Sequence, residues 1–143
     1  AMIELIKSRY GNYLSTIKMT GDYNGSARQL SQSDNASLYT QLQRGLKLRD
    51  SQLVLVSNPK HSNSRADCNY FLANFPDFKI NPQTCPDTCR DMRVVQCDAF
   101  GTIIKKQRND LAQQADHIDG FRYFVNTFMM DWILKSQKGW YKK

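Results

Sequence analysis

Residues 116–135 read DHIDGFRYFVNTFMMDWILK, and this stretch carries the clearest pattern of the chain. Its apolar side chains recur every three or four residues, which places them on one face of an α-helix: Ile118, Phe121, Val125, Phe128, Met129 and Trp132. We therefore predict a long amphipathic helix that buries this face. Asp116 and Asp119, three residues apart at its start, share a side that borders the apolar face.

Shorter helices are predicted upstream of this one. The first opens the chain and stops at Gly11, a residue type that commonly ends helices. The second is capped by Asp34 or Asn35 and places leucines at four-residue spacing. The predicted helices cover residues 2–10, 35–46, 62–74 and 86–92.

Between the helices, short apolar or alternating runs are typical of β-strands. They cover residues 13–19, 52–56 and 78–81, and residues 94–97 and 102–104 flank a turn as in a hairpin. Strands that alternate with helices predict an α/β domain with a mainly parallel sheet and helices on both faces. We assign residues 2–135 to this single domain and residues 136–143 to a basic, mobile tail.

Composition narrows the class of protein. The chain has 143 residues, of which 41% are hydrophobic, enough for one core. No apolar stretch approaches the roughly 20 residues that cross a bilayer, so we expect no membrane contact and a cytoplasmic location. The four cysteines lack the paired CxxC spacing of a structural zinc site, and we expect reduced thiols.

The charge balance favours a polyanionic partner. Twenty Lys and Arg against 13 Asp and Glu leave a net charge of +7, which suits DNA through counterion release. A soluble basic surface without a nucleic-acid partner explains the same balance. The cations we select as candidate DNA contacts lie in a polar loop, at a helix start and after the hairpin: Arg28, Lys60, Arg65, Lys105 and Lys106. Solvated loops and helix ends are the simpler explanation of each.

Carboxylates supply a candidate metal site. Asp22 follows the first predicted strand, where ligands of open α/β sheets bind, and Asp119 and Asp116 lie on the last helix. Oxygen ligands gathered in this way suit Mg²⁺ or Mn²⁺. The alternatives stay open, because Asp22 after a glycine is also typical of a turn, and Asp116 near a helix start is typical of a cap.

Four segments, in this order, resemble the nuclease domain of phage terminase large subunits. Thr20-Gly21-Asp22-Tyr23-Asn24-Gly25-Ser26 is similar to the family's T-G-D-A-S-G segment, and Asn58-Pro59 through Ser64-Arg65 to an N-P and S-R segment. Cys85 through Asp91-Met92, Gly101 and Ile104-Lys105 resembles a stretch that ends in a lysine. Asp119-Gly120-Phe121-Arg122-Tyr123 resembles the closing D-A-L-R-Y helix.

The resemblance implies an RNase H-like fold and a divalent-metal-dependent endonuclease that cuts concatemeric phage or prophage DNA during packaging. Asp22 and Asp119 would be metal ligands of a two-metal Mg²⁺ or Mn²⁺ site, and Lys105 the site's lysine. The implied partners are double-stranded DNA, the phage portal and the small terminase subunit, in the cytoplasm of a bacterial host.

Departures from the family qualify this expectation. Many members carry His three residues before the last aspartate, where this chain has Asp116, with His117 displaced by one. The family's first aspartate-bearing strand and its ATPase motor have no counterpart, so we expect an N-terminally incomplete fold, no ATP binding and weak or absent catalysis. The missing strand would leave a sheet edge exposed, which predicts edge pairing in a homodimer or a helix over that edge.

Two hypotheses from other classes of function remain. The chain could be a basic DNA-binding or packaging-assembly module without catalysis. It could also be an unrelated α/β domain whose aspartates lie far apart, since the ions of two-metal sites are about 4 Å apart.

Overall fold

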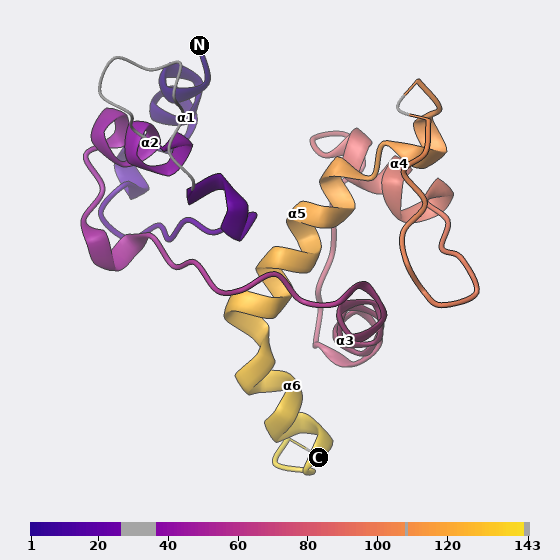
Figure 1. The fold of residues 1–143 in the computed structure, drawn as a ribbon. Helices are drawn as coiled ribbons and strands as arrows, with labels where there is room; N and C mark the ends of the chain where they lie inside the picture. Colours follow the sequence, from indigo (N-terminus) through magenta and orange to yellow (C-terminus); the bar gives the residue numbers. More distant parts are fainter. Residues whose placement is uncertain (27–36, 108, 142–143) are drawn as a thin grey trace. The chain divides into compact units, whose positions relative to one another are not determined.

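A computed structural model of the chain describes residues 1–26, 37–107 and 109–141 (Figure 1). The chain divides into two compact units, Ala1–Ser57 and Asn58–Lys143. Each unit has its own packing. None of the helices in the described ranges is long and apolar enough to cross a membrane.

The predicted α/β fold is wrong for the residues that the structure describes. These residues form helices and contain no β-strand; β-pairing is confined to two isolated bridges, Met19 with Leu53 in parallel and Cys97 with Ile103 in antiparallel orientation. The RNase H-like, mainly parallel sheet with helices on both faces is therefore absent from the described ranges. The sheet edge through which we predicted a homodimer is absent with it.

The first unit is built on two helices. Helix α1 spans Met2–Tyr10 and α2 spans Leu38–Leu46, with short 3-10 turns at Gly11–Tyr13, Tyr23–Ser26 and Asp50–Gln52. Ser37 caps α2, because its hydroxyl accepts the backbone N–H of Thr40 at 3.1 Å. The caps predicted for α2, Asp34 and Asn35, lie outside the described residues.

Local hydrogen bonds explain why the first two predicted strands do not form. The segments meet at one point only, where Met19 N–H donates to the Gln52 carbonyl (2.7 Å) and Val54 N–H to the Met19 carbonyl (2.9 Å). The buried side-chain amide of Gln52 donates to the carbonyls of Leu14 and Ile17 at 2.7 and 2.8 Å. It thereby takes the acceptors that a second strand would have used.

The second unit packs four helices around an aromatic core. Helix α3 spans His61–Asn74, α4 Pro86–Val94, α5 Asp116–Phe124 and α6 Met130–Gln137. Figure 1 shows α5 and α6 as one rod, with α4 beside the start of α5. Phe71 of α3 is 1% exposed and lies at the centre of this core. Its ring contacts five others: Phe75, Phe78, Phe121, Phe124 and Trp132.

The long C-terminal helix predicted from residues 116–135 is confirmed, with one interruption. A π-helical turn, Val125–Met129, joins α5 to α6. Phe121, Val125 and Ile133, which are separated by multiples of four residues, are all buried. A strict four-residue repeat drifts around an α-helix of 3.6 residues per turn. The wider π turn takes up this drift, so that the apolar face stays on the core.

The remaining strand predictions also fail in the second unit. Residues 78–81 have no strand partner among the residues that the structure describes, and the hairpin is paired only where Cys97 faces Ile103. The turn itself is formed, because Asp98 N–H donates to the Thr102 carbonyl (2.9 Å) and Ile104 N–H to the Gln96 carbonyl (3.0 Å). Two short strands without a third are only marginally stable, so pairing ends after these bonds.

Candidate functional site

The carboxylate of Asp119, in the first turn of α5, lies between two cations. The Lys105 ammonium is bound to Oδ2, and Arg122 Nη1 donates to Oδ1 at 2.6 Å. The side chain of Asp119 is 14% exposed, that of Arg122 5% and that of Lys105 32%. Both oxygens of Asp119 are therefore engaged, and Lys105 is the member of the group that reaches solvent.

Arg122 connects this group to the start of α3. Its Nε donates to the hydroxyl of buried Ser64 at 2.7 Å, and its Nη2 donates to the Pro59 carbonyl at 3.2 Å. The planar guanidinium offers donors in a fixed fork, which satisfies three acceptors from separate segments at once. The backbone at Pro59 and helix α3 are thus held at a fixed distance from Asp119.

His61, the first residue of α3, completes the group. Its Nδ1 accepts the backbone N–H of Ile103 at 3.1 Å, so the neutral ring carries its proton on Nε2. Burial lowers the pKa of His61 below its usual value of 6.5, and the positive charges of Arg122 and Lys105 act in the same direction against Asp119. His61 is therefore a neutral donor near pH 7.

The hairpin turn is fixed to α3 beside this group. Asp98 Oδ1 accepts the N–H groups of Phe100 and Thr102, both at 2.9 Å. Gly101 has a φ of +81°, which favours glycine. A Cβ at Gly101 would lie 3.2 Å from the Arg65 guanidinium. The turn thus lies against Arg65 at one point and is bonded to His61 through Ile103 at another.

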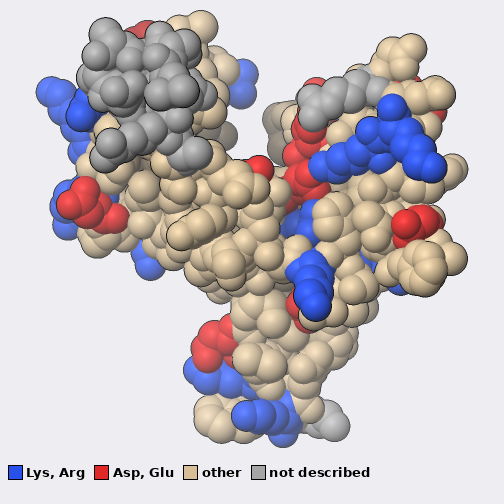
Figure 2. Space-filling view, viewed as in Figure 1, with Lys and Arg blue, Asp and Glu red and all other residues tan. Residues whose placement is uncertain are grey.

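We call His61, Lys105, Asp119 and Arg122 the Asp119 cluster. It carries one negative charge and two permanent positive charges, and exposed cations adjoin it along the chain: Lys60, Arg65 and Lys106. Figure 2 shows basic side chains of the second unit in separate groups with acidic groups beside them. The excess positive charge of the second unit is therefore concentrated in these basic groups.

The predicted site residues separate into those that the structure brings together and those that it does not. Lys105 and Asp119, predicted as catalytic residues, form an ion pair. Asp116 is exposed, and the N–H of its neighbour His117 is accepted by Asp91 at 3.0 Å. Arg28 lies outside the described residues. Asp22 belongs to the first unit, so its prediction as a partner of Asp119 stays a prediction.

Within the first unit, Asp22 lies in a turn around Tyr39. Its Oδ1 accepts the N–H of Asn24 at 2.9 Å, and its carbonyl accepts the Tyr39 hydroxyl at 2.8 Å. A Cβ at Gly25 would lie 2.8 Å from the Tyr39 ring, and one at Gly21 would clash with it as well. Both glycines of the T-G-D-Y-N-G-S segment therefore have a packing role, and the turn alternative for Asp22 gains support.

The side chains of the Asp119 cluster do not fit a metal ion as they stand. Asp119 already binds Lys105 and Arg122, and the described residues contain no group of three or more His, Cys, Asp or Glu side chains that could hold a metal. A Mg²⁺ ion needs several oxygen ligands, of which the Asp119 cluster offers one carboxylate that already binds two cations. No catalytic step through a metal follows from this arrangement.

Sequence reasoning missed Arg122 as a member of the site. Arg122 follows Asp119 by three residues, a spacing that brings the two side chains together on a helix, and this signal was available. The hydrogen bond between Ile103 and His61 had no comparable signal, because it spans 42 residues.

Comparison of the chain with models of protein families, with curated proteins and with solved structures produced no match.

Proposed function

We propose that the second unit binds the phosphodiester backbone of nucleic acid, with double-stranded DNA as the first candidate. The observation that supports this most directly is the Asp119 cluster, in which one carboxylate holds two cations at the start of α3 and leaves an excess positive charge. Residues 58–143 contain 13 Lys and Arg and nine Asp and Glu, so the unit as a whole is basic. Phosphate contacts of this kind position a protein on nucleic acid without reading its sequence.

The cations next to the cluster are available for such contacts. Lys60, Arg65 and Lys106 are exposed, and none of the three side chains makes a hydrogen bond or ion pair within the described ranges. His61 adds a neutral Nε2–H donor, and Lys60 and His61 stand where α3 begins, an end with positive dipole that favours phosphate. Each phosphate that a cation neutralises releases counterions and so makes binding salt-dependent.

The proposal that this chain acts in phage DNA packaging rests on the four motifs alone. Residues from three of these motifs meet at the Asp119 cluster. One motif supplies Lys105, and another supplies Asp119 and Arg122. A third supplies Ser64 and Pro59, which accept hydrogen bonds from Arg122. The portal and the small terminase subunit are proposed partners on the same ground. DNA cleavage is left out of the proposed function, because Asp119 is already engaged by cations.

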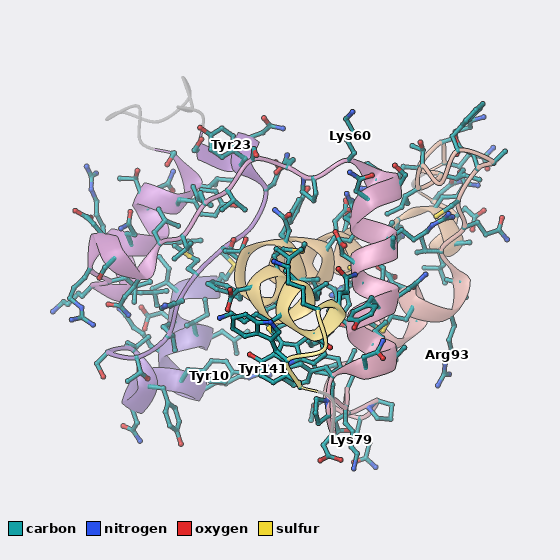
Figure 3. All side chains as sticks on the ribbon, turned by 90° about the horizontal axis from the view of Figure 1, so that it is seen from below. Tyr10, Tyr23, Lys60, Lys79, Arg93 and Tyr141 are labelled. Carbon is teal, nitrogen blue, oxygen red and sulfur yellow. The ribbon has the colours of Figure 1, made fainter. Side chains whose placement is uncertain are left out.

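A charge-matched pair of double variants tests the proposal. Figure 3 shows Lys60 at one end of α3, and Lys79 and Arg93 toward the other. The chain is titrated against a fluorescent DNA duplex at about 50 and 200 mM salt. We expect Lys60→Ala with Arg65→Ala to weaken binding about tenfold and to reduce the salt slope by about 2, as two lost phosphate contacts would.

Lys79→Ala with Arg93→Ala is the matched control, since it removes the same net charge from exposed positions. If both pairs weaken binding equally, only the net charge matters and the site is wrong. If the wild-type chain fails to bind duplex DNA even at low salt, the proposed function is wrong.

A further inference from the structure

The tip of the hairpin turn exposes an aromatic ring. Phe100 is 85% exposed, while the other exposed large apolar side chains of the described ranges do not exceed 69%. A single exposed apolar side chain is ordinary in soluble proteins. Phe100 differs because of how its backbone is held and what lies beside it.

The backbone that carries Phe100 is rigidly placed. Its N–H is bonded to Asp98 Oδ1 at 2.9 Å, and the next residue, Gly101, is buried with its N–H bonded to the Asp98 carbonyl at 3.0 Å. The turn is bonded in addition to His61 of the Asp119 cluster through Ile103. The ring therefore protrudes from a fixed turn and pays little conformational entropy when it contacts a partner.

The surroundings of the ring carry positive charge. The Arg65 guanidinium lies against Gly101, and Lys105 and Lys106 follow the hairpin directly. A flat, uncharged ring flanked by cations matches a nucleotide, whose base stacks on aromatic faces while its phosphate meets Lys and Arg. A protein partner would meet a ring too small to bury alone, with charges that disfavour an apolar interface.

We propose that Phe100 is a base-stacking residue, on which an unpaired nucleobase of single-stranded or frayed DNA lies while Arg65 and Lys106 contact the adjacent phosphates. The inference rests on the proposed function and adds to it a preference for DNA with unpaired bases. Duplex DNA keeps its bases stacked on one another and gains nothing from Phe100. The ring thus contacts only the base, and the cations contact only the phosphates.

The test uses the full chain and a short single-stranded oligonucleotide that contains 2-aminopurine, whose fluorescence is quenched when the base stacks. Wild-type protein is expected to quench it further on binding. Phe100→Ala and Phe100→Leu are both expected to lose this change and to bind the single strand about tenfold more weakly. Phe100→Trp should restore both readouts, and duplex affinity should be unchanged in all three variants.

The leucine variant is the matched control, because it keeps an apolar side chain and removes only the aromatic face. Trp140→Ala removes another exposed ring, one whose face is near the Lys135 ammonium, and should leave both readouts unchanged. If Phe100→Leu binds single strands as tightly as the wild-type chain does, the stacking assignment is wrong, while duplex binding and the proposed function stand. If the wild-type chain binds no DNA at all, both are wrong.

Discussion

The carboxylate of Asp91 accepts the backbone N–H of His117 at 3.0 Å and thereby ties α4 to the first turn of α5. Its side chain has no exposed surface, and its other oxygen accepts from Arg90 at 2.9 Å. A helix N-terminus has N–H groups without partners inside the helix, and one of them is satisfied here from a neighbouring helix. The orientation of α5, and with it the position of Asp119, depends on this bond.

Asp91→Ala should therefore destabilise the second unit by about 2–3 kcal/mol, because a buried N–H is left without its acceptor and Arg90 without its buried partner. Urea unfolding followed by circular dichroism measures the change. Asp87→Ala is the control, since it removes an exposed carboxylate that pairs with the same Arg90 and should change stability little. Equal effects of the two variants would show that the bond to His117 contributes nothing.

His61 should titrate below pH 6.5 and make stability pH-dependent. Its folded-state pKa is lowered, so the folded state holds fewer protons than the unfolded state in this region. The stabilisation is present above about pH 6.5 and is lost as the pH falls through the folded-state pKa. In His117→Gln, His61 is the chain's only histidine, and its ring resonance reports the pKa by NMR. A midpoint at or above 6.5 would contradict the burial of the His61 ring beside Arg122.

Two glycine substitutions should act in opposite directions. Gly101→Ala should destabilise by about 1–2 kcal/mol, because Gly101 has a positive φ and Arg65 must move. Gly120→Ala should stabilise by about 0.5–1 kcal/mol, because Gly120 lies within α5 with nothing within 4 Å of an added Cβ. Thermal unfolding midpoints measure both. A stabilising Gly101→Ala would contradict the fixed hairpin turn.

We expect no nicking of supercoiled plasmid by this chain at physiological Mg²⁺, or with Mn²⁺ in its place. Both oxygens of Asp119 bind cations of the protein, and a metal ion would first have to displace Lys105. Agarose gels resolve nicked from supercoiled plasmid. Nicking that disappears in Asp119→Asn, an isosteric change, would show that Asp119 serves a metal and that the arrangement described above is a resting state.

Helices were predictable from the sequence because their pattern is local. The predicted 2–10 helix coincides with α1, and the third and fourth predicted helices differ from α3 and α4 by at most two residues at an end. A strand depends on a partner far along the chain, which no local pattern reveals. Residues 13–19 have the alternation of a strand, yet the Gln52 amide binds their carbonyls.

The same distinction applies to the candidate site. Lys105 and Asp119 were selected by their motifs, and their ion pair joins them across 14 residues. The bonds from Arg122 to Ser64 and Pro59 span 58 and 63 residues, so they could not be derived from spacing. Sequence reasoning thus identified the two residues at the centre of the cluster and missed those that hold it.

The π-helical turn between α5 and α6 holds one residue more than the α-helical turn that it replaces. Loss of one residue there would restore a regular α-helix and leave Ile133, which is fully buried, within about 20° of the side that carries Phe121. Gain of one residue would instead rotate everything after the π turn by about 100° and turn Ile133 away from the core. This stretch should therefore tolerate the loss of a residue far better than the gain of one.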